Sequence, residues 1–221
     1  MNNSDTNLLL LEGPDDIGVI YHLFRYHQIP VASPGRLETG KITLENGNGV
    51  NQILTSLKVR LKIQDSDTAV NRLGIIIDAN MHLEARWQSL RRILRDAGYS
   101  NIPEFPLPEG TIINEDGLII FGVWLMPDNQ VPGKLENFIQ FLVKPDDKLW
   151  DQAEECIKQI PVINRRFSEQ DLIKAQVHTW LAWQEEPGKP MGQAITKKYL
   201  DADAPYALEL INWIHRLFSF G

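Results

Sequence analysis

Acidic side chains follow two short apolar runs in the first eighty residues. Glu12 ends the run 8–11, and Asp78 ends the run 73–77. Asp16 lies one turn into a predicted helix that begins just after Glu12. If the two runs are neighbouring parallel strands, their carboxyl ends share one edge of the sheet, and these three side chains meet there. Carboxylate oxygens suit hard divalent cations, so the sequence predicts a site for Mg²⁺ or Mn²⁺.

Each carboxylate taken alone also has a purely structural explanation. Asp16 can cap a helix, Asp78 can accept hydrogen bonds from turn amides, and Glu12 can be a solvated loop residue. Asn80 lies two residues beyond Asp78 and could face the same pocket. The joint placement of these residues favours a shared site over independent structural roles.

The hydrophobic pattern predicts strands that alternate with helices. A strand at 8–11 precedes a helix, a second strand lies within 37–44, and a helix starts at Val50. The run 73–77 is apolar without alternation, as in strands covered on both faces, and Gly98 is placed to end the helix after it. The expected fold class is therefore α/β, with a mostly parallel sheet flanked by helices.

The second half of the chain is predicted to be mainly helical. Segments 111–113 and 118–125 flank a turn and indicate a hairpin at the sheet edge. Helical spacing then covers 135–142, 149–160, 168–183 and 206–218, with a capping box expected at Ser168. We therefore expect an α/β domain over residues 1–145 and a helical cap or extension over 146–221, packed on it.

The segment Glu12-Gly13-Pro14-Asp15-Asp16 after a leucine strand resembles the Glu-Gly-x-x-Asp signature of the Toprim domain of topoisomerases, bacterial primases and OLD-type nucleases. The glycine-containing turn 46–49 and the segment 75–80 fall where that family has its glycine turn and its Asp-x-Asp motif. The resemblance covers roughly residues 7–142, and the whole chain looks like the stand-alone Toprim-like proteins of bacteria.

This resemblance implies phosphodiester chemistry. It assigns proton transfer to Glu12 and places Mg²⁺ (or Mn²⁺) on Asp16 and Asp78, with all three residues catalytic. Asn80 stands where the family has a second Asp and is expected as a metal ligand there, but it is neutral, so metal affinity should fall and a second ion becomes doubtful. The chain shows no cleavage domain with a nucleophilic Tyr, which argues against a topoisomerase, and a primase is nearly as unlikely a reading.

The segment 126–136 follows an apolar strand and precedes a helix. By similarity to OLD-type nucleases, Asp128 or Glu136 could supply the missing carboxylate, and Glu136 is the metal ligand we expect. The simpler explanation is that Pro, Asp, Asn and Gly make turns and that Glu136 suits a helix N-terminus. Lys134 or Lys144 could contact a phosphate, although most lysines are solvated.

Several further features have two explanations. Residues 47–49 are either an ordinary loop or a cradle of backbone amides for phosphate. Trp180 and Trp183 could stack on bases, but their helical spacing favours core packing. The basic cluster on 86–95 is either a solvated helix face or a contact to phosphates, and His178 and His215 lack a partner at metal-ligand spacing.

Composition narrows the function classes. The net charge of −7 gives no general attraction to nucleic acid, and the single cysteine excludes an intrachain disulfide framework. No apolar run approaches the ~20 residues needed to span a bilayer, so no membrane association and a cytoplasmic location are expected.

Two functions are compatible with these observations. The first is a Mg²⁺-dependent nuclease or phosphoryl-transfer protein acting on nucleic acid phosphodiesters. The second is a catalytically weakened Toprim-like subunit for interaction or nucleotide sensing. The chain has no Walker motif, so its ATPase partner would be a separate protein.

Overall fold

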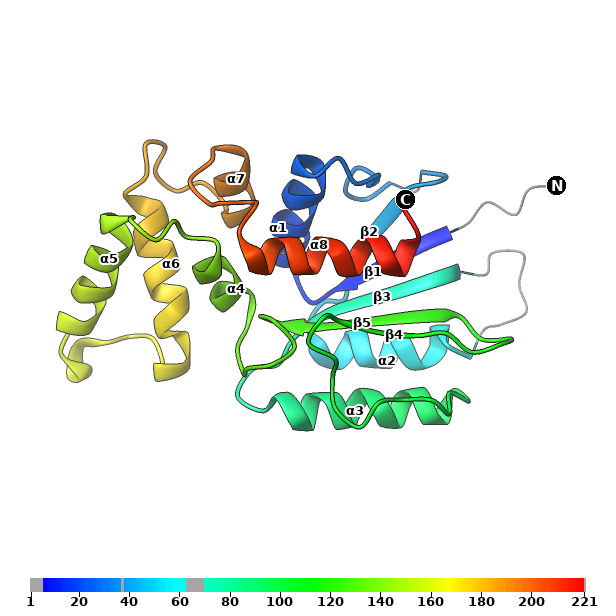
Figure 1. The fold of residues 1–221 in the computed structure, drawn as a ribbon. Coiled ribbons are helices and arrows are strands. Elements are labelled where there is room, and N and C mark those ends of the chain that lie inside the picture. The colour runs from blue at the N-terminus through cyan, green and yellow to red at the C-terminus, as the bar shows by residue number, and fades with distance from the viewer. Residues whose placement is uncertain (1–5, 37, 63–69, 221) are drawn as a thin grey trace.

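The computed structural model describes residues 6–36, 38–62 and 70–220, and it shows a five-stranded sheet between two layers of helices (Figure 1). The strands are β1 (Thr6–Leu11), β2 (Ile42–Asn46), β3 (Val70–Asp78), β4 (Thr111–Ile113) and β5 (Ile120–Met126). Their spatial order is β2-β1-β3-β5-β4, and only β4 is antiparallel to its neighbour. The predicted α/β fold class and the predicted edge hairpin are confirmed.

The central strands are apolar because helices cover both of their faces. Residues 73–77 of β3 are buried, as expected for a strand without alternation. The second strand lies later than its predicted range 37–44, because a turn with Gly40 at φ +74° precedes it. Leu37 itself lies outside the described residues.

One pair of helices covers each face of the sheet (Figure 1). Helices α1 (Pro14–Tyr26) and α8 (Pro205–Phe218) lie on one face, and α2 (Val50–Arg60) and α3 (Leu83–Asp96) lie on the other. Each pair builds a separate hydrophobic cluster with the side chains that its face of the sheet presents. Gly98 follows α3 at φ +99°, which confirms the predicted stop.

The C-terminal helix α8 packs directly on the sheet. A Cβ atom on Gly122 would lie 2.4 Å from Leu217 Cδ2, so a glycine in β5 allows this close approach. Trp213 packs against Trp124 of β5 with ring centroids 5.7 Å apart. One hydrophobic cluster therefore contains residues from both sides of position 145.

The remaining helices gather beyond the carboxyl ends of the strands (Figure 1). They are α4 (Leu135–Phe141), α5 (Lys148–Gln159), α6 (Leu172–Ala182) and α7 (Met191–Thr196), together with the short 3-10 turns η1 (Val162–Asn164) and η2 (Glu169–Asp171). The predicted helices near 135–142, 149–160 and 206–218 are confirmed, whereas α7 is too short for its pattern to stand out. Across the described ranges, no helix has the length and apolar character that crossing a membrane requires.

The capping box predicted at Ser168 is wrong. Its hydroxyl donates to Asp171 Oδ2 over 2.6 Å, and its side chain accepts no hydrogen bond from the backbone of the first turn. The chain forms the 3-10 turn η2 first, and α6 begins only at Leu172. The carboxylate of Asp171 therefore accepts a hydrogen bond from the Ser168 hydroxyl and does not form a capping box with it.

Candidate functional site

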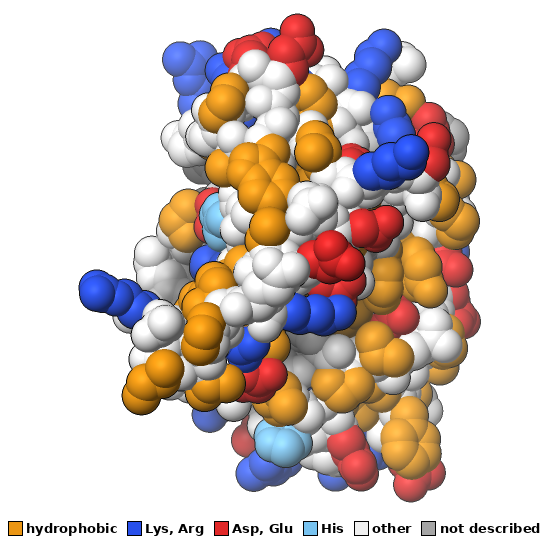
Figure 2. Space-filling model, turned by 90° about the vertical axis from the view of Figure 1, so that its left-hand side faces the viewer, with side chains coloured by type: hydrophobic (Ala, Val, Ile, Leu, Met, Phe, Trp, Pro, Cys, Tyr) orange, Lys and Arg blue, Asp and Glu red, His pale blue; other side chains and the backbone are white. Residues whose placement is uncertain are grey.

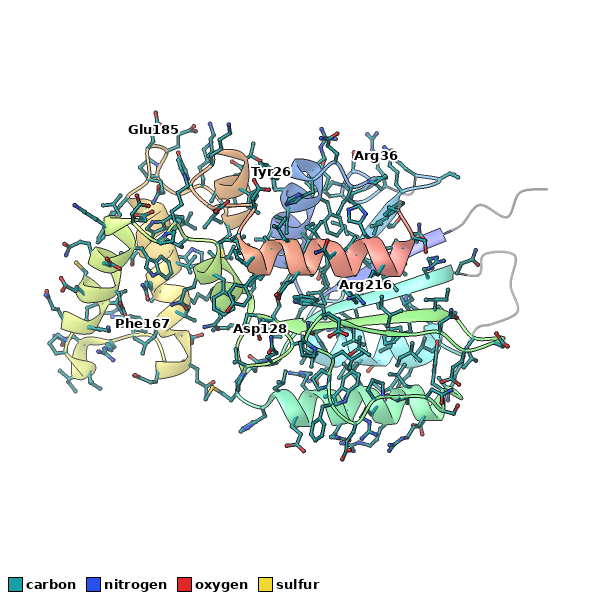
Figure 3. The ribbon with its side chains drawn as sticks, viewed as in Figure 1. Tyr26, Arg36, Asp128, Phe167, Glu185 and Arg216 are labelled. Carbon is teal, nitrogen blue, oxygen red and sulfur yellow. The ribbon has the colours of Figure 1, made fainter. Side chains whose placement is uncertain are left out.

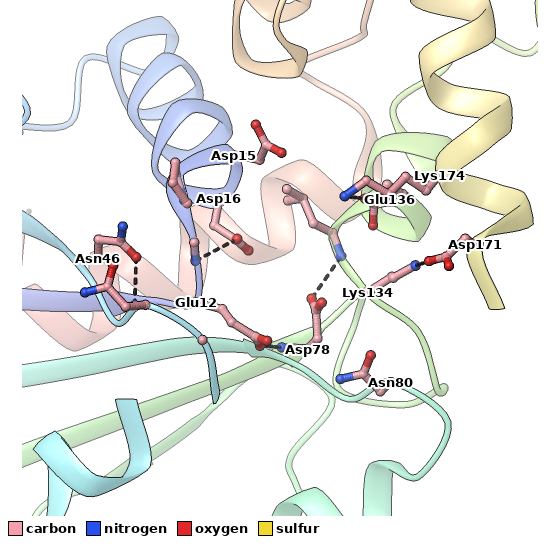
Figure 4. A pocket seen from close by; sticks show the side chains of 15 residues that line it. Glu12, Asp15, Asp16, Asn46, Asp78, Asn80, Lys134, Glu136, Asp171 and Lys174 are labelled. Atoms are coloured by element: carbon pink, nitrogen blue, oxygen red, sulfur yellow. Dashed lines mark hydrogen bonds and ion pairs between the residues drawn. The ribbon is translucent and has the colours of Figure 1, made fainter. Parts of the chain in front are cut away.

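A pocket of about 480 Å³ lies at the carboxyl ends of β1 and β3 (Figure 4). Its lining has a strong excess of acidic side chains over basic ones. The carboxylates are Glu12, Asp15, Asp16, Asp78, Glu136 and Asp171, and the lysines are Lys134 and Lys174. The predicted site residues Glu12, Asp16, Asp78, Asn80 and Glu136 therefore all border one pocket.

Strand register brings Glu12 and Asp78 together. Leu11 pairs with Ile76 across the parallel strands β1 and β3, so both chains reach their ends at the same level. The backbone N–H of Asp78 donates to Glu12 Oε2 over 3.1 Å. Asp78 Oδ1 in turn accepts a hydrogen bond of 3.0 Å from the backbone N–H of Leu135, at the start of α4. Two strand ends and one helix start are thereby tied to one another.

Asp16 enters the pocket from the first turn of α1. Its Oδ2 accepts a hydrogen bond of 3.1 Å from the backbone N–H of Gly13, so it does take part in capping the helix. Its Oδ1 is buried and has no hydrogen-bond partner within the described part of the chain. Asp16 is only 8% exposed. A buried carboxylate oxygen without a donor is costly unless a ligand satisfies it, so helix capping alone does not account for this residue.

Burial and mutual repulsion make these carboxyl groups hard to ionise. Burial is the main cause that raises the pKa of Asp16 to about 7, and the nearby charges of Glu12 and Glu136 add to it. Burial likewise raises the pKa of Asp78 to about 8, with repulsion from Asp16, Glu12 and Glu136, against the opposing hydrogen bond from Leu135. A bound cation would relieve both effects.

Two lysines reach the acidic pocket, and each pairs with a carboxylate. Lys174 Nζ on α6 lies 3.4 Å from Glu136 Oε1 on α4. Lys134 Nζ lies 3.1 Å from Asp171 Oδ1 at the end of η2. The sequence reasoning did not single out Lys174 or Asp171, because they are more than 150 residues away from Glu12 in the chain and only packing of the helices brings them here.

Asn80 lines the pocket but is exposed, with its backbone at φ +54°. Its backbone N–H donates to the carbonyl oxygen of Gly133 over 2.7 Å, which closes the loop after β3 against the loop before α4. Asn80 therefore lies at the exposed rim of the pocket, near Asp78 (Figure 4).

The turn at 47–49 is not a free cradle of amides. The N–H groups of Gly47 and Gly49 donate to the carbonyl oxygens of Leu11 and Glu12, over 2.7 and 2.9 Å. The N–H of Asn48 donates to Asn46 Oδ1 over 2.8 Å. Of the two explanations left open for residues 47–49, the hydrogen bonds favour the ordinary loop, because these amides join the end of β2 to the end of β1.

Other sequence candidates have structural roles. Asp128 lies in the loop after β5 (Figure 3), where its Oδ1 accepts from the N–H groups of Gln130 and Val131, so of the two proposed carboxylates only Glu136 reaches the pocket. Lys144 donates to the carbonyl oxygen of Lys198 and does not line the pocket. Trp180 is fully buried in the core.

Within the basic cluster on α3, Arg92 and Arg95 are exposed, as on a solvated helix face, whereas Arg86 serves the fold. Arg86 Nε donates to the carbonyl oxygen of Asp78 over 3.0 Å, and this hydrogen bond joins α3 to the end of β3. On the face shown in Figure 2, acidic and basic side chains are intermixed, and no continuous basic track crosses it.

The residues of the pocket fit a cation that takes few protein ligands. The carboxylates of the lining offer oxygen ligands, which hard divalent ions prefer, and the buried Oδ1 of Asp16 has no hydrogen-bond partner among the residues that the structure describes. Within ranges 6–36, 38–62 and 70–220, however, no three His, Cys, Asp or Glu side chains form a group that could hold a metal ion. An ion here would depend on one or two of the carboxylates and complete its shell with water and substrate oxygens.

Comparison with known proteins places the whole chain in one family. The family model described as "Protein of unknown function (DUF3226)" matches residues 6–219. The chain belongs to the DUF3226 family. No curated protein matches it, and no solved structure does. The DUF3226 match runs from β1 to α8, so it covers both the carboxylates and the lysines of the pocket.

Proposed function

We propose that this DUF3226 protein is a Mg²⁺- or Mn²⁺-dependent nuclease with a Toprim-like site. The observation that carries the proposal is the convergence of Glu12, Asp16 and Asp78 at one pocket, where one buried carboxylate oxygen of Asp16 has no donor among the described residues. Buried like-charged carboxylates are unfavourable for folding alone, and they are typical of sites that hold a cation against phosphate.

Each residue has a distinct part in this proposal. Asp16 and Asp78 hold the ion, and Glu12 moves a proton through Oε1 while its Oε2 stays on the Asp78 amide. When bound, Mg²⁺ supplies neutralisation of the charge that develops on the phosphate oxygens. Lys134, whose side chain is 17% exposed, stands near enough to the rim to meet a phosphate that displaces Asp171.

The test is metal-dependent cleavage of single-stranded, duplex and branched DNA and RNA by the full chain. Asp78→Asn keeps an oxygen for the Leu135 amide, so we expect it to fold normally and to lose about 100-fold or more of the activity. Asp116→Asn is the matched control, because Asp116 is exposed on the turn between β4 and β5 and should leave the activity unchanged.

Three results would refute this proposal. One is that the parent protein leaves every substrate intact with either ion. Another is that Asp78→Asn cleaves as fast as Asp116→Asn. A cleavage rate that does not change when the metal is removed with a chelator would also refute it.

A second function is favoured by the pairing of the lysines. Both pocket lysines are engaged by carboxylates, and Asn80 replaces a charged ligand at the rim, so the pocket suits a weakened site in an interaction or nucleotide-sensing subunit with a separate ATPase partner. This alternative predicts no binding of Mg²⁺ at millimolar concentration in calorimetric titration, together with stable co-purification of an ATPase. Binding of the ion by the isolated chain favours the nuclease instead.

A further inference from the structure

Glu136 is a buried carboxylate whose positive partner comes from a distant part of the chain. The Glu136 side chain is 6% exposed in the first turn of α4, whereas the Lys174 side chain on α6 is 48% exposed. Their charged atoms lie 3.4 Å apart, at the side of the pocket nearest α6 (Figure 4). The helical part of the molecule thus supplies a cation to a carboxylate near the strand ends.

The position of Glu136 makes a positive partner necessary. Its charge is close enough to raise the pKa of both Asp16 and Asp78, so all three carboxylates repel one another. A buried carboxylate among like charges needs a compensating cation. Lys174 is the cation that pairs with Glu136 among the residues described, since Lys134 is held by Asp171.

We propose that Lys174, by pairing with Glu136, withholds this carboxylate from metal, so that the pocket binds one divalent ion, on Asp16 and Asp78. This inference rests on the metal site of the proposed function and deepens it, because it sets the number of ions. It changes the role expected for Glu136 from metal ligand to anchor for Lys174. It also gives helix α6 a role at the site, because α6 holds Lys174 against Glu136.

The ion pairs at the pocket support a single ion. Of its six carboxylates, Glu136 pairs with Lys174 and Asp171 pairs with Lys134. One divalent cation would balance Asp16 and Asp78, whereas Glu12 is assigned to proton transfer and Asp15 is exposed to solvent. The neutral Asn80 adds no charge for a second ion. A second divalent ion could bind Glu136 only by displacing the ammonium group of Lys174. The ion pair with Glu136 opposes this displacement.

The experiment counts Mn²⁺ ions bound per chain by titrating full-length protein and measuring free Mn²⁺ by electron paramagnetic resonance. We expect one ion for the parent and for Lys174→Arg, which keeps the charge, and two ions for Lys174→Met, which uncovers Glu136. Lys189→Met is the matched control, because Lys189 pairs with Glu186 away from the pocket, and it should bind one ion. The double variant Glu136→Gln/Lys174→Met should return to one ion.

Glu136→Gln alone keeps the inference testable even if Lys174→Met does not fold. It removes the charge with little change in volume, and we expect it still to bind one ion. Loss of the ion in this variant would show that Glu136 is a ligand and would overturn the inference. The inference would also be overturned if the parent bound two ions, if folded Lys174→Met bound one ion, or if the double variant bound two ions. No ion on the parent would instead reject the metal site of the proposed function, and the inference with it.

Discussion

At the scale of single residues, the protein places two carboxyl groups, those of Asp16 and Asp78, where burial opposes their ionisation. Asp16 and Asp78 could be satisfied as ordinary capping residues only if each used both of its oxygens. The described hydrogen bonds engage Oδ2 of Asp16 and Oδ1 of Asp78, and Oδ1 of Asp16 remains buried without a partner. The cost of this arrangement falls on stability, so it should be measurable without any substrate.

The stability of the metal-free protein should therefore fall as pH rises. The folded-state pKa values of about 7 for Asp16 and about 8 for Asp78 lie above the ordinary value of 3.8. Between these values the folded state binds protons that the unfolded chain has lost, so the stabilisation is complete below pH 3.8 and is lost progressively as the pH rises to the folded-state pKa values of about 7 and about 8. We expect the free energy of unfolding to drop by on the order of a few kcal/mol between pH 5 and 8.5, as measured by urea titration in the presence of chelator.

Asp16→Asn should make this pH dependence clearly shallower and should raise stability at pH 8.5. Asp116→Asn, on an exposed turn, should retain the slope of the parent protein. A parent protein whose stability is level or rises between pH 5 and 8.5 would contradict the unfavourable burial of these carboxylates.

At the scale of elements, the site depends on how closely the helices approach one another. Helix α1 carries Asp16, and α7 packs against it so closely that a Cβ atom on Gly192 would lie 2.3 Å from the backbone oxygen of Gly18. A backbone atom cannot move aside as a flexible side chain can. The glycine in α7 therefore helps to fix α1 and the C-terminal helices relative to each other.

Gly192→Ala should destabilise the protein by about 1–3 kcal/mol, because the added methyl group forces α7 away from α1. Gly18→Ala is the control on the facing helix. A Cβ atom there meets nothing within 4 Å, so we expect no loss and a gain of up to about 1 kcal/mol from helix propensity. The free energy of unfolding of both variants is measured by urea titration. Equal stability of the two variants would show that the contact between α1 and α7 can accommodate the added methyl group.

At the scale of the whole molecule, the C-terminal helix completes the core that the N-terminal strands begin. Trp213 of α8 packs on Trp124 of β5, and its Nε1 donates to the carbonyl oxygen of Thr111 over 3.3 Å. The sheet face that carries Leu9 and Leu11 is buried in the same cluster as α8. Residues 1–145 alone would therefore expose an apolar sheet face to water.

We expect residues 1–145 expressed alone to aggregate or to remain unfolded, and the full chain to unfold in one cooperative transition. Circular dichroism and tryptophan fluorescence should then give coincident urea curves. Two separated transitions in the full chain, or a soluble and cooperatively folded fragment, would show that the predicted domain over 1–145 folds without α8.

Much of the fold was predictable because strands and helices are recorded in local patterns. The apolar run of β3, the stop at Gly98 and the edge hairpin each depend on neighbouring residues alone. The limits of β2 and the start of α6 were missed because turns shifted them, and turn geometry depends on contacts made elsewhere. The short α7 was missed because six residues show too little periodicity for a pattern to be recognised.

The sequence by itself determined that Glu12 and Asp78 each end an apolar strand of a mostly parallel sheet, because strand and helix patterns alternate along the chain. That these two strands are neighbours was decided by the tertiary structure. Only the tertiary structure decided that Lys174 pairs with Glu136, that Asp171 holds Lys134, and that the amides of the turn 47–49 are already used. The physical reason is the separation along the chain between the residues that interact. Local periodicity sets where an element begins and which face it buries, whereas contacts between elements far apart in the chain follow from the packing of the whole core.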